Sequence, residues 1–292
     1  MVLQIPVGNV RVVKPYVGGG FGPKCEATPL ELSCAFLSRF TGKPVKMTYS
    51  REQVFLHSRA RHQFFAEMSL GVRKDGTMVA LKNKAILDGG AYTSFGIATV
   101  YYAGSLLGGP YKLKSMKYDG YRAYTNKPAC GAQRGHGGVA HRAAFEQLID
   151  RTAGELGIDP IELRLKNIMT AGDMTVNELD MSSLGMKECI EAVKEHSGWQ
   201  NKKGKLRRGK GIGMACGFFV SGAGYPIYRS DTYHSTGVIK LSEDGGTAIV
   251  QTGSAEIGQG SDTTMAMIAA KTLGISIDNV KVVSGDTDLS VG

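Results

Sequence analysis

The sequence contains no apolar run near the ~18–20 residues that a membrane-spanning helix needs, so an integral membrane protein is not expected. Its five cysteines are odd in number and none forms a CxxC pair, which excludes the usual spacings of iron–sulfur and zinc sites. A disulfide framework is equally unexpected, and the amino terminus lacks the charged and apolar regions of an export signal. Together these absences predict a protein of the reducing cytoplasm, without a membrane partner.

Acidic residues are few relative to basic ones: 26 Asp and Glu against 35 Lys and Arg give a net charge of +9. The densest basic run, Lys202–Lys210, has no aromatic residue among its charges, whereas nucleic-acid surfaces combine the two. We interpret the run as a solvated linker and expect no nucleic-acid partner. With 42% hydrophobic residues, the chain of 292 residues has enough apolar material for a packed core and for two domains.

Glycine, in contrast to cysteine and to acidic residues, is abundant in the sequence. The chain has 40 glycines among 292 residues, about twice the usual ~7% share, but only nine prolines and no Gly-X-Y period. Collagen and Pro/Gly-rich disorder are therefore excluded. The surplus glycine is expected to serve unusual backbone angles or close approach of the backbone to a ligand.

The pattern of apolar and turn residues predicts strands and helices in mixed order. The clearest strand signal is a hairpin over His62–Ala91 that turns at Asp75-Gly76, and the clearest helix is Gly137–Leu156. By contrast, Tyr101–Arg134 shows no clear period, and residues 170–210 look like a connector. The other expected elements are strands at Val10–Val17, Pro44–Tyr49 and Val280–Ser284, a hairpin of Thr236–Leu241 and Thr247–Thr252, helices at Glu26–Phe40, Lys187–His196 and Met265–Leu273, and a helix with Asp159, Pro160 and Glu162 at its start.

Three glycine-rich loops, Gly18–Lys24, Ala132–Gly138 and Glu256–Gly260, each stand before an expected helix. The first fits neither a P-loop nor a dinucleotide fingerprint, because Pro23 stands where each needs glycine. A single such loop is as readily a tight structural turn; Gln259 could cap its loop internally, and Arg134 could be a surface residue. Three loops that each open a helix, however, fit one extended polar or anionic cofactor held by backbone N–H groups.

In that order the loops, GGGFGPK, CGAQRGHG and AEIGQG, resemble those of the molybdenum hydroxylase family, which includes xanthine dehydrogenase and aldehyde oxidoreductase. The resemblance covers essentially the whole chain. It implies an α+β fold built from parts of two molybdopterin-binding domains of the large subunit, at residues 1–170 and 211–292, with a connector at 171–210. It also implies molybdopterin, in its cytosine dinucleotide form, with molybdenum held by the pterin dithiolene and no protein ligand to the metal.

The resemblance assigns roles residue by residue. The implied cofactor-binding residues are Gly20, Phe21 and Gly22 over the molybdenum centre, Arg134 and Gly135 at the pterin, and Gly258, Gln259 and Gly260 at the pterin or its pyrophosphate. The candidate substrate contacts are Cys25, Tyr101, Tyr102 and His136. The family's catalytic glutamate lies beyond residue 292, so no catalytic residue is expected in this chain, which we expect to be a fragment that is inactive alone.

Longer strings, among them YYAGSLL, ELGIDPIELRLKN and GDTDLS, are more similar to 4-hydroxybenzoyl-CoA reductase within the family. This similarity implies reductive removal of the para-hydroxyl of an aromatic CoA thioester, with iron–sulfur clusters on a small partner subunit and FAD on a medium one. Cys25, His136 and Tyr101-Tyr102 depart from the purine-oxidising members, and an aromatic-lined slot suits a benzoyl ring. The alternatives are an oxidative hydroxylase acting on an aldehyde, purine or other N-heterocycle, and a non-catalytic basic binding domain.

Overall fold

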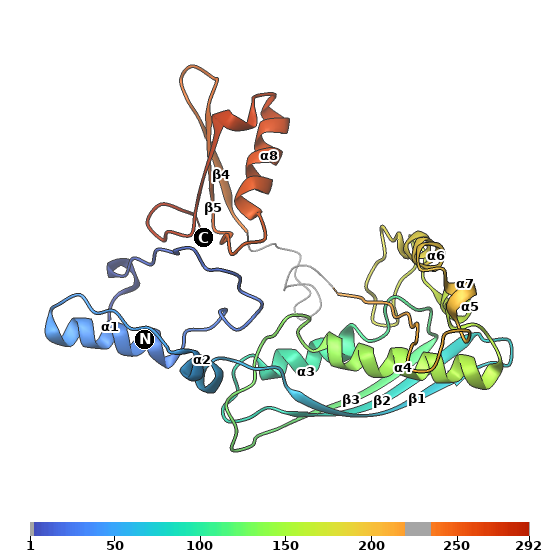
Figure 1. Ribbon diagram of the computed structural model, residues 1–292. Helices are drawn as coiled ribbons and strands as arrows, with labels where there is room; N and C mark the ends of the chain where they lie inside the picture. The colour runs from blue at the N-terminus through green and yellow to red at the C-terminus, as the bar shows by residue number, and fades with distance from the viewer. Residues whose placement is uncertain (1–2, 220–234, 292) are drawn as a thin grey trace. The chain divides into compact units, whose positions relative to one another are not determined.

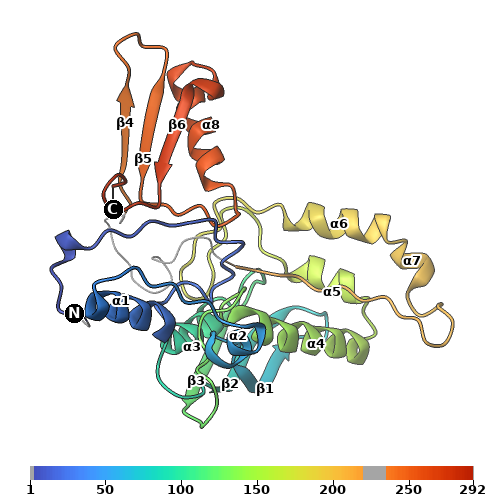
Figure 2. The same ribbon diagram turned by 60° about the vertical axis from the view of Figure 1, so that its left-hand side comes forward.

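The computed structural model describes residues 3–219 and 235–291, and the chain divides into two compact units. The first unit comprises Met1–Phe55 and Ser230–Gly292, and the second comprises Leu56–Arg229. Within the described residues, each unit contains a three-stranded sheet accompanied by helices (Figure 1, Figure 2), so the fold is α+β as expected. The domain boundaries expected at residues 170 and 210 stay a prediction.

The sheet of the second unit begins with the predicted hairpin. Strands β1 (Gln63–Val72) and β2 (Met78–Asp88) are antiparallel, and Gly76 in their turn adopts a φ of 86°. The chain then crosses over through α3 (Gly96–Ser105) to β3 (Ser115–Ala123), which is parallel to β2. Alternate residues of β2 face opposite sides, so that one face is buried and the other carries exposed lysines. Helix α3 contacts β3, and α4 (Gly138–Leu156) contacts β1.

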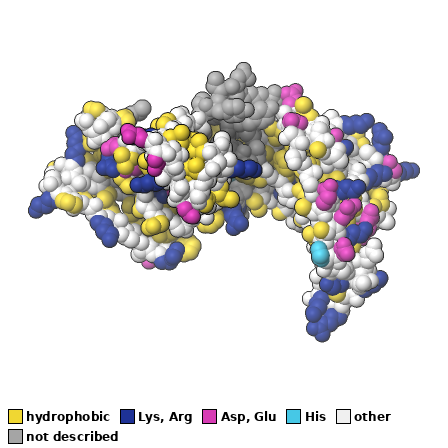
Figure 3. Space-filling model, turned by 90° about the horizontal axis from the view of Figure 1, so that it is seen from above, with side chains coloured by type: hydrophobic (Ala, Val, Ile, Leu, Met, Phe, Trp, Pro, Cys, Tyr) yellow, Lys and Arg dark blue, Asp and Glu magenta, His cyan; other side chains and the backbone are white. Residues whose placement is uncertain are grey.

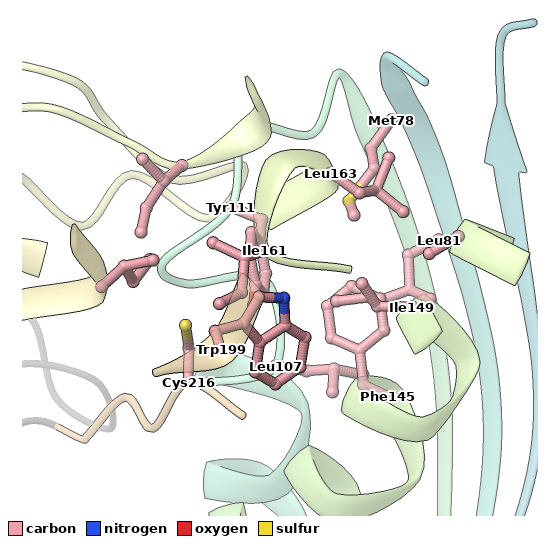
Figure 4. Close-up of a cluster of buried hydrophobic side chains, with 13 residues drawn as sticks. Met78, Leu81, Leu107, Tyr111, Phe145, Ile149, Ile161, Leu163, Trp199 and Cys216 are labelled. Atoms are coloured by element: carbon pink, nitrogen blue, oxygen red, sulfur yellow. The ribbon is translucent and has the colours of Figure 1, made fainter. Parts of the chain in front are cut away.

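The core of the second unit lies between strand β2, the segment after α3, helix α4 and the chain that follows α4. Three shorter helices come next, α5 (Pro160–Asn167), α6 (Met186–His196) and α7 (Trp199–Lys202). Asp159 is the N-cap of α5 as predicted, and its other oxygen accepts a hydrogen bond from Trp199 Nε1 at 2.9 Å. Trp199 is the sole tryptophan of the sequence and packs into an apolar cluster with Phe145 and Tyr111 (Figure 4). Its fluorescence therefore reports on the folding of this unit.

The first unit combines elements from distant parts of the sequence. Its early elements are the 3-10 helix η1 (Val7–Asn9), α1 (Pro29–Thr41) and the start of α2 (Arg51–His57). Its later elements are β4 (Gly237–Leu241), β5 (Ala248–Thr252), α8 (Ser261–Leu273), the 3-10 helix η2 (Ile277–Asn279) and β6 (Val280–Ser284). Strand β5 is antiparallel to β4 and parallel to β6, so both units share the order strand, strand, helix, strand. The buried apolar side chains of β5 and α8 are small: Ala248 and Val250 on β5, and Ala266, Ala269 and Ala270 on α8.

Two predicted strands are wrong. Val10–Val17 forms only an isolated bridge, between Val13 and Asp286, because Pro15 lacks the N–H that would continue a ladder. Pro44–Tyr49 has no strand partner among the described residues, and a segment without a hydrogen-bonded neighbour is not a β-strand.

The helix expected at Glu26–Phe40 begins three residues later, at Pro29, where Thr28 and Glu31 form a capping box. The described helices contain none that is long and apolar enough to cross a bilayer. On the face seen in Figure 3, Lys and Arg side chains lie at many separate places and are interspersed with Asp and Glu. The basic run Lys202–Lys210 is almost entirely exposed, as a solvated segment should be.

Candidate functional site

The first glycine loop holds a phenylalanine in a strained backbone conformation. Phe21 has a φ of 53°, in the left-handed region that non-glycine residues rarely adopt, which costs about 1 kcal/mol or more. Its side chain is nevertheless 59% exposed. The ring lies against Gly19, where an added Cβ would approach the ring's Cε2 atom to 2.4 Å. An exposed aromatic ring on a strained backbone is typical of a binding loop rather than of a packed core.

This loop does not open a helix directly, so that part of the expectation is wrong. Helix α1 starts only at Pro29, and its N-terminus is already satisfied by the capping box, in which Thr28 N donates to Glu31 Oε2 at 2.7 Å. Cys25 closes the loop instead, because its exposed thiol donates to Gly22 O at 2.7 Å. The backbone of the loop itself, rather than a helix terminus, is therefore what it offers a ligand.

The Glu256–Gly260 loop leads into a helix as predicted, although α8 begins at Ser261, four residues before the expected start at Met265. Gly260, with a φ of 84°, is the N-cap of α8. The Gln259 side chain is turned into its own loop: its Oε1 accepts from Ile257 N at 2.7 Å, and its Nε2 donates to Ala255 O at 3.0 Å. The structure thus shows Gln259 as an internal cap, and its contact with a cofactor stays a prediction.

These two loops lie against each other in the first unit. Gly19 N donates to Ile257 O at 3.1 Å, and an added Cβ on Gly20 would come within 2.8 Å of Ile257 Cδ1. A side chain at position 20 would therefore displace the end of the Ile257 side chain. We call Gly18–Gly22 together with Glu256–Gly260 the paired loops. They bring the predicted cofactor-binding residues of two distant sequence segments into one place.

Phe21→Gly is expected to change the free energy of unfolding by less than about 1 kcal/mol, because glycine adopts the same φ without strain. Phe145→Ala, which removes a fully buried ring from the second unit, is the matched control and should lose about 3–5 kcal/mol. Urea unfolding followed by circular dichroism measures both. A loss of the control's size in Phe21→Gly would mean that Phe21 is a core residue.

The third glycine loop opens α4 in the second unit, as predicted. Its N-cap is Gly137, where an added Cβ would lie 2.3 Å from Thr99 O of α3, so glycine is required there. Gly135 adopts a φ of 83°. The Arg134 side chain is exposed at this turn, while its backbone carbonyl accepts a hydrogen bond from Arg61 Nη2 at 2.5 Å. The loop presents Arg134 at the surface beside the start of α4.

Three of the predicted substrate residues lie near this loop. His136 Nε2 pairs with Thr99 Oγ1 at 3.0 Å, and the His136 and Tyr102 rings lie 5.1 Å apart. Burial lowers the pKa of His136 below its ordinary value, so the ring is neutral at pH 7. Tyr102 is only 4% exposed and packs in an apolar cluster with Leu106 and Met169, whereas Tyr101 is 47% exposed. Tyr101 is therefore the more accessible of the two for a ligand.

Tyr101 lines an open groove between α3 and β3 that the sequence did not reveal. The groove has a volume of ≈ 590 Å³, and its walls include Ile97, Val100, Met116 and Tyr118. The Tyr118 hydroxyl is engaged within the protein, because it donates to Val100 O at 2.9 Å. The walls are thus mainly apolar and aromatic, which suits a planar ring.

The described parts of the chain contain no cluster of three His, Cys, Asp or Glu side chains arranged to hold a metal ion. The expectation that a cofactor supplies the metal ligands stays a prediction.

Comparisons with known proteins agree with the loop motifs. A family model described as a molybdopterin cofactor-binding domain matches residues 1–168, and a second model of that description matches residues 192–291. The putative xanthine dehydrogenase molybdenum-binding subunit of Escherichia coli K12 is 36% identical over 297 residues, which cover 99% of this chain and 39% of the relative. The nicotinate dehydrogenase large molybdopterin subunit of Eubacterium barkeri is 34% identical, over 66% of this chain and 46% of the relative.

Among solved structures, quinoline 2-oxidoreductase from Pseudomonas putida 86 superposes with a TM-score of 0.88 at 31% identity. The match covers 99% of this chain and 38% of that protein. The chain thus spans less than half the length of each of these relatives.

Proposed function

Because the chain belongs to the molybdenum hydroxylase family through its molybdopterin cofactor-binding domains, we propose that the longer protein is the large subunit of a molybdenum oxidoreductase. The observation that carries the proposal is the contact between the paired loops, which joins two of the family's cofactor motifs through Gly19 N and Ile257 O. A non-catalytic basic binding domain gains no support, since neither loop contributes a lysine or arginine to this contact.

The paired loops fit an extended polar cofactor. Gly19, Gly22 and Gly258 adopt φ angles of 96°, 104° and 111°, which a residue with a side chain would adopt only under strain. Without side chains at these positions, the backbone of the loops can lie close to a ligand. Gly20 to Gly22 would lie toward the metal, with the Phe21 ring excluding water from it. Gly258, Gln259 and Gly260 would bond the pterin through groups other than the N–H groups of Gly258 and Gly260, which donate to Glu256. The resemblance of their motif also assigns pterin contacts to Arg134 and Gly135, in the loop that opens α4. When bound, the cofactor supplies two-electron redox chemistry at molybdenum, and the chain supplies orientation and electrostatics.

We favour oxidative hydroxylation of a planar N-heterocycle as the reaction. Relatives named for xanthine, nicotinate and quinoline oxidation support this reading better than reductive dehydroxylation of 4-hydroxybenzoyl-CoA, which rests on sequence strings alone. The apolar groove at Tyr101 has walls suited to a flat ring of either kind. Cys25 and His136 still distinguish this chain from purine-oxidising members, so quinoline-like or nicotinate-like rings are preferred over purines.

The complete protein with its partner subunits decides between these reactions. Metal analysis and pterin release test for the cofactor first. Turnover is then measured by dye reduction with quinoline, nicotinate, xanthine and benzaldehyde, and by reductant consumption with 4-hydroxybenzoyl-CoA. Oxidation of a heterocycle with the highest kcat/KM supports the proposal. Activity on the thioester alone would make the protein a reductive member, and absence of molybdenum would overturn the family function altogether.

The remaining parts of the assembly follow from the same proposal. A small subunit with iron–sulfur clusters and a medium subunit with FAD would exchange electrons with molybdenum, and the pterin would be the cytosine dinucleotide form. A cytoplasmic location remains the expectation from cysteine use. Copurification followed by flavin, iron and nucleotide analysis tests each of these components separately.

Arg134→Ala in the complete protein should lower molybdenum and pterin occupancy, or turnover, by about tenfold or more, because a charge-assisted bond is lost. Arg151→Ala is the matched control, since Arg151 is an exposed arginine of α4 away from the loop. Full occupancy and unchanged turnover in Arg134→Ala would show that Arg134 is an ordinary surface residue.

A further inference from the structure

A carboxylate of the chain itself occupies the N-terminus of α8. Glu256 Oε1 accepts from Gly258 N at 2.6 Å and from Gly260 N at 3.2 Å. Glu256 Oε2 accepts from Asp262 N at 3.2 Å. Two of these bonds, from Gly260 N and Asp262 N, take amides that a helix N-terminus ordinarily offers to an anion. The three bonds also lower the pKa of Glu256, so the group is ionised at neutral pH.

The hydrogen bonds to Glu256 also fix the position of the Gln259 side chain. With Gly258 and Gly260 both tied to Glu256, the residue between them, Gln259, is held in the position where its amide bonds Ile257 N and Ala255 O. The carbonyl of Ile257 in turn accepts from Gly19 N of the other loop. Glu256 is therefore the charged centre of a chain of hydrogen bonds that extends across the paired loops.

We infer that Glu256 is a positioning residue for the cofactor: its carboxylate stands in the place of a bound anion, and it holds the paired loops in the arrangement that receives the pterin. The inference rests on the proposed function. It implies that the cofactor's phosphates bind elsewhere than the α8 N-terminus, because Glu256 already takes those donors and would repel a second anion. If a phosphate of the cofactor were bound at the α8 N-terminus instead, Glu256 would not be needed for cofactor binding.

The test compares three variants of the complete protein. Glu256→Ala removes the carboxylate, Glu256→Gln keeps its shape without the charge, and Glu243→Ala is the control, an exposed glutamate in the turn between β4 and β5 of the same unit. Hydrogen exchange of peptides spanning Ile257–Asp262 reports on the loop, and molybdenum and pterin content reports on the cofactor. Both readouts are obtained without relying on turnover.

In Glu256→Ala we expect exchange in this segment to accelerate on the order of tenfold and cofactor content to fall by a similar factor, since bonds to a charged group are lost. Glu256→Gln should show smaller changes of the same kind, and Glu243→Ala none. Formate, which is small enough to occupy the vacated carboxylate position, should restore slow exchange and cofactor loading in Glu256→Ala, whereas chloride at equal ionic strength should not.

Two results would overturn the inference. One is faster exchange with unchanged cofactor content, which would make Glu256 a structural cap only. The other is cofactor content above the wild-type level in Glu256→Ala, which would mean that phosphate uses the α8 N-terminus itself. Failure of the proposed function is recognised separately, because the wild-type protein would then contain no molybdenum or pterin.

Discussion

Glu146→Gln is expected to lower the free energy of unfolding by about 3–5 kcal/mol, because it leaves the buried guanidinium of Arg164 with only the half-exposed Asp150 as a counter-charge. Glu146 lies on α4 and is 3% exposed. Its Oε2 accepts from Arg164 Nε at 2.8 Å and from Cys216 N at 3.1 Å, and its Oε1 accepts from the Tyr111 hydroxyl at 2.8 Å. One carboxylate thus joins α4, α5, the segment after α3 and the segment after α7.

Asp150→Asn is the matched control, because Asp150 pairs with the same arginine but has a 47% exposed side chain. Its loss should cost no more than about 1 kcal/mol, as is typical of an ion pair in contact with water. Urea unfolding monitored by the fluorescence of Trp199 measures the free energy of unfolding of the second unit in both variants. Equal losses in the two variants would contradict the claim that desolvation decides the effect.

Elements with strong local signals were predictable from the sequence. The hairpin at Asp75-Gly76 follows from a dipeptide that tolerates positive φ, and α4 follows from its apolar stripe. The start of α5 was also predicted, because Asp159 and Pro160 are local capping signals. Each of these predictions depends only on residues within one or two turns of the chain. The start of α1 was missed although Thr28 and Glu31 carry the same kind of signal.

The elements that were missed depend on tertiary contacts. Strand β3 turns Arg122 to the buried face of its sheet, which hides the apolar alternation, and the guanidinium is satisfied by Gly89 O and His62 Nε2. Helix α3 shows no polar face in sequence, and its Gly104 lies against the Tyr118 ring of β3, where an added Cβ would come within 2.3 Å of the ring. Periodicity cannot reveal an element whose pattern is set by a distant partner.

In the candidate site, too, the local features were predictable from the sequence and the features that depend on tertiary contacts were not. The glycine motifs identified the loops, because glycine at positive φ is a property of the local backbone. The contact between Gly19 and Ile257, the burial of Tyr102 and the anchoring role of Glu256 each require two distant segments to meet. For Tyr102, the adjacent position of Tyr101 gave no indication that helix geometry would place one ring in the core and the other in the groove.

Acidification from pH 7.5 to pH 5 is expected to lower the free energy of unfolding of the second unit by roughly 4 kcal/mol, about 2 kcal/mol for each of two buried histidines. Burial, with the charge of Arg122 as a second cause, lowers the pKa of His62 to about 4. Burial lowers the pKa of His141 to about 3. Both rings are neutral when folded: His141 Nδ1 donates to Gly137 O at 3.2 Å, and His62 Nε2 accepts from Arg122 Nε at 3.2 Å.

The sign follows from which state binds protons. Below an ordinary histidine pKa of about 6.5 the unfolded chain binds protons, whereas the two folded rings stay neutral. Their contribution to the free energy of unfolding is therefore present above pH 6.5 and is lost as the pH falls toward 4. Carboxylates such as Asp75, whose folded pKa is lowered to about 2, contribute only at more acidic pH and leave this window to the histidines. Replacing His141, whose ring packs against Phe64, by Phe should remove about 2 kcal/mol of the loss, whereas replacing the exposed His196 by Asn should preserve it. Urea unfolding by Trp199 fluorescence at pH 7.5 and pH 5 measures the difference, and a pH-independent wild type would show that these rings are protonated in the fold.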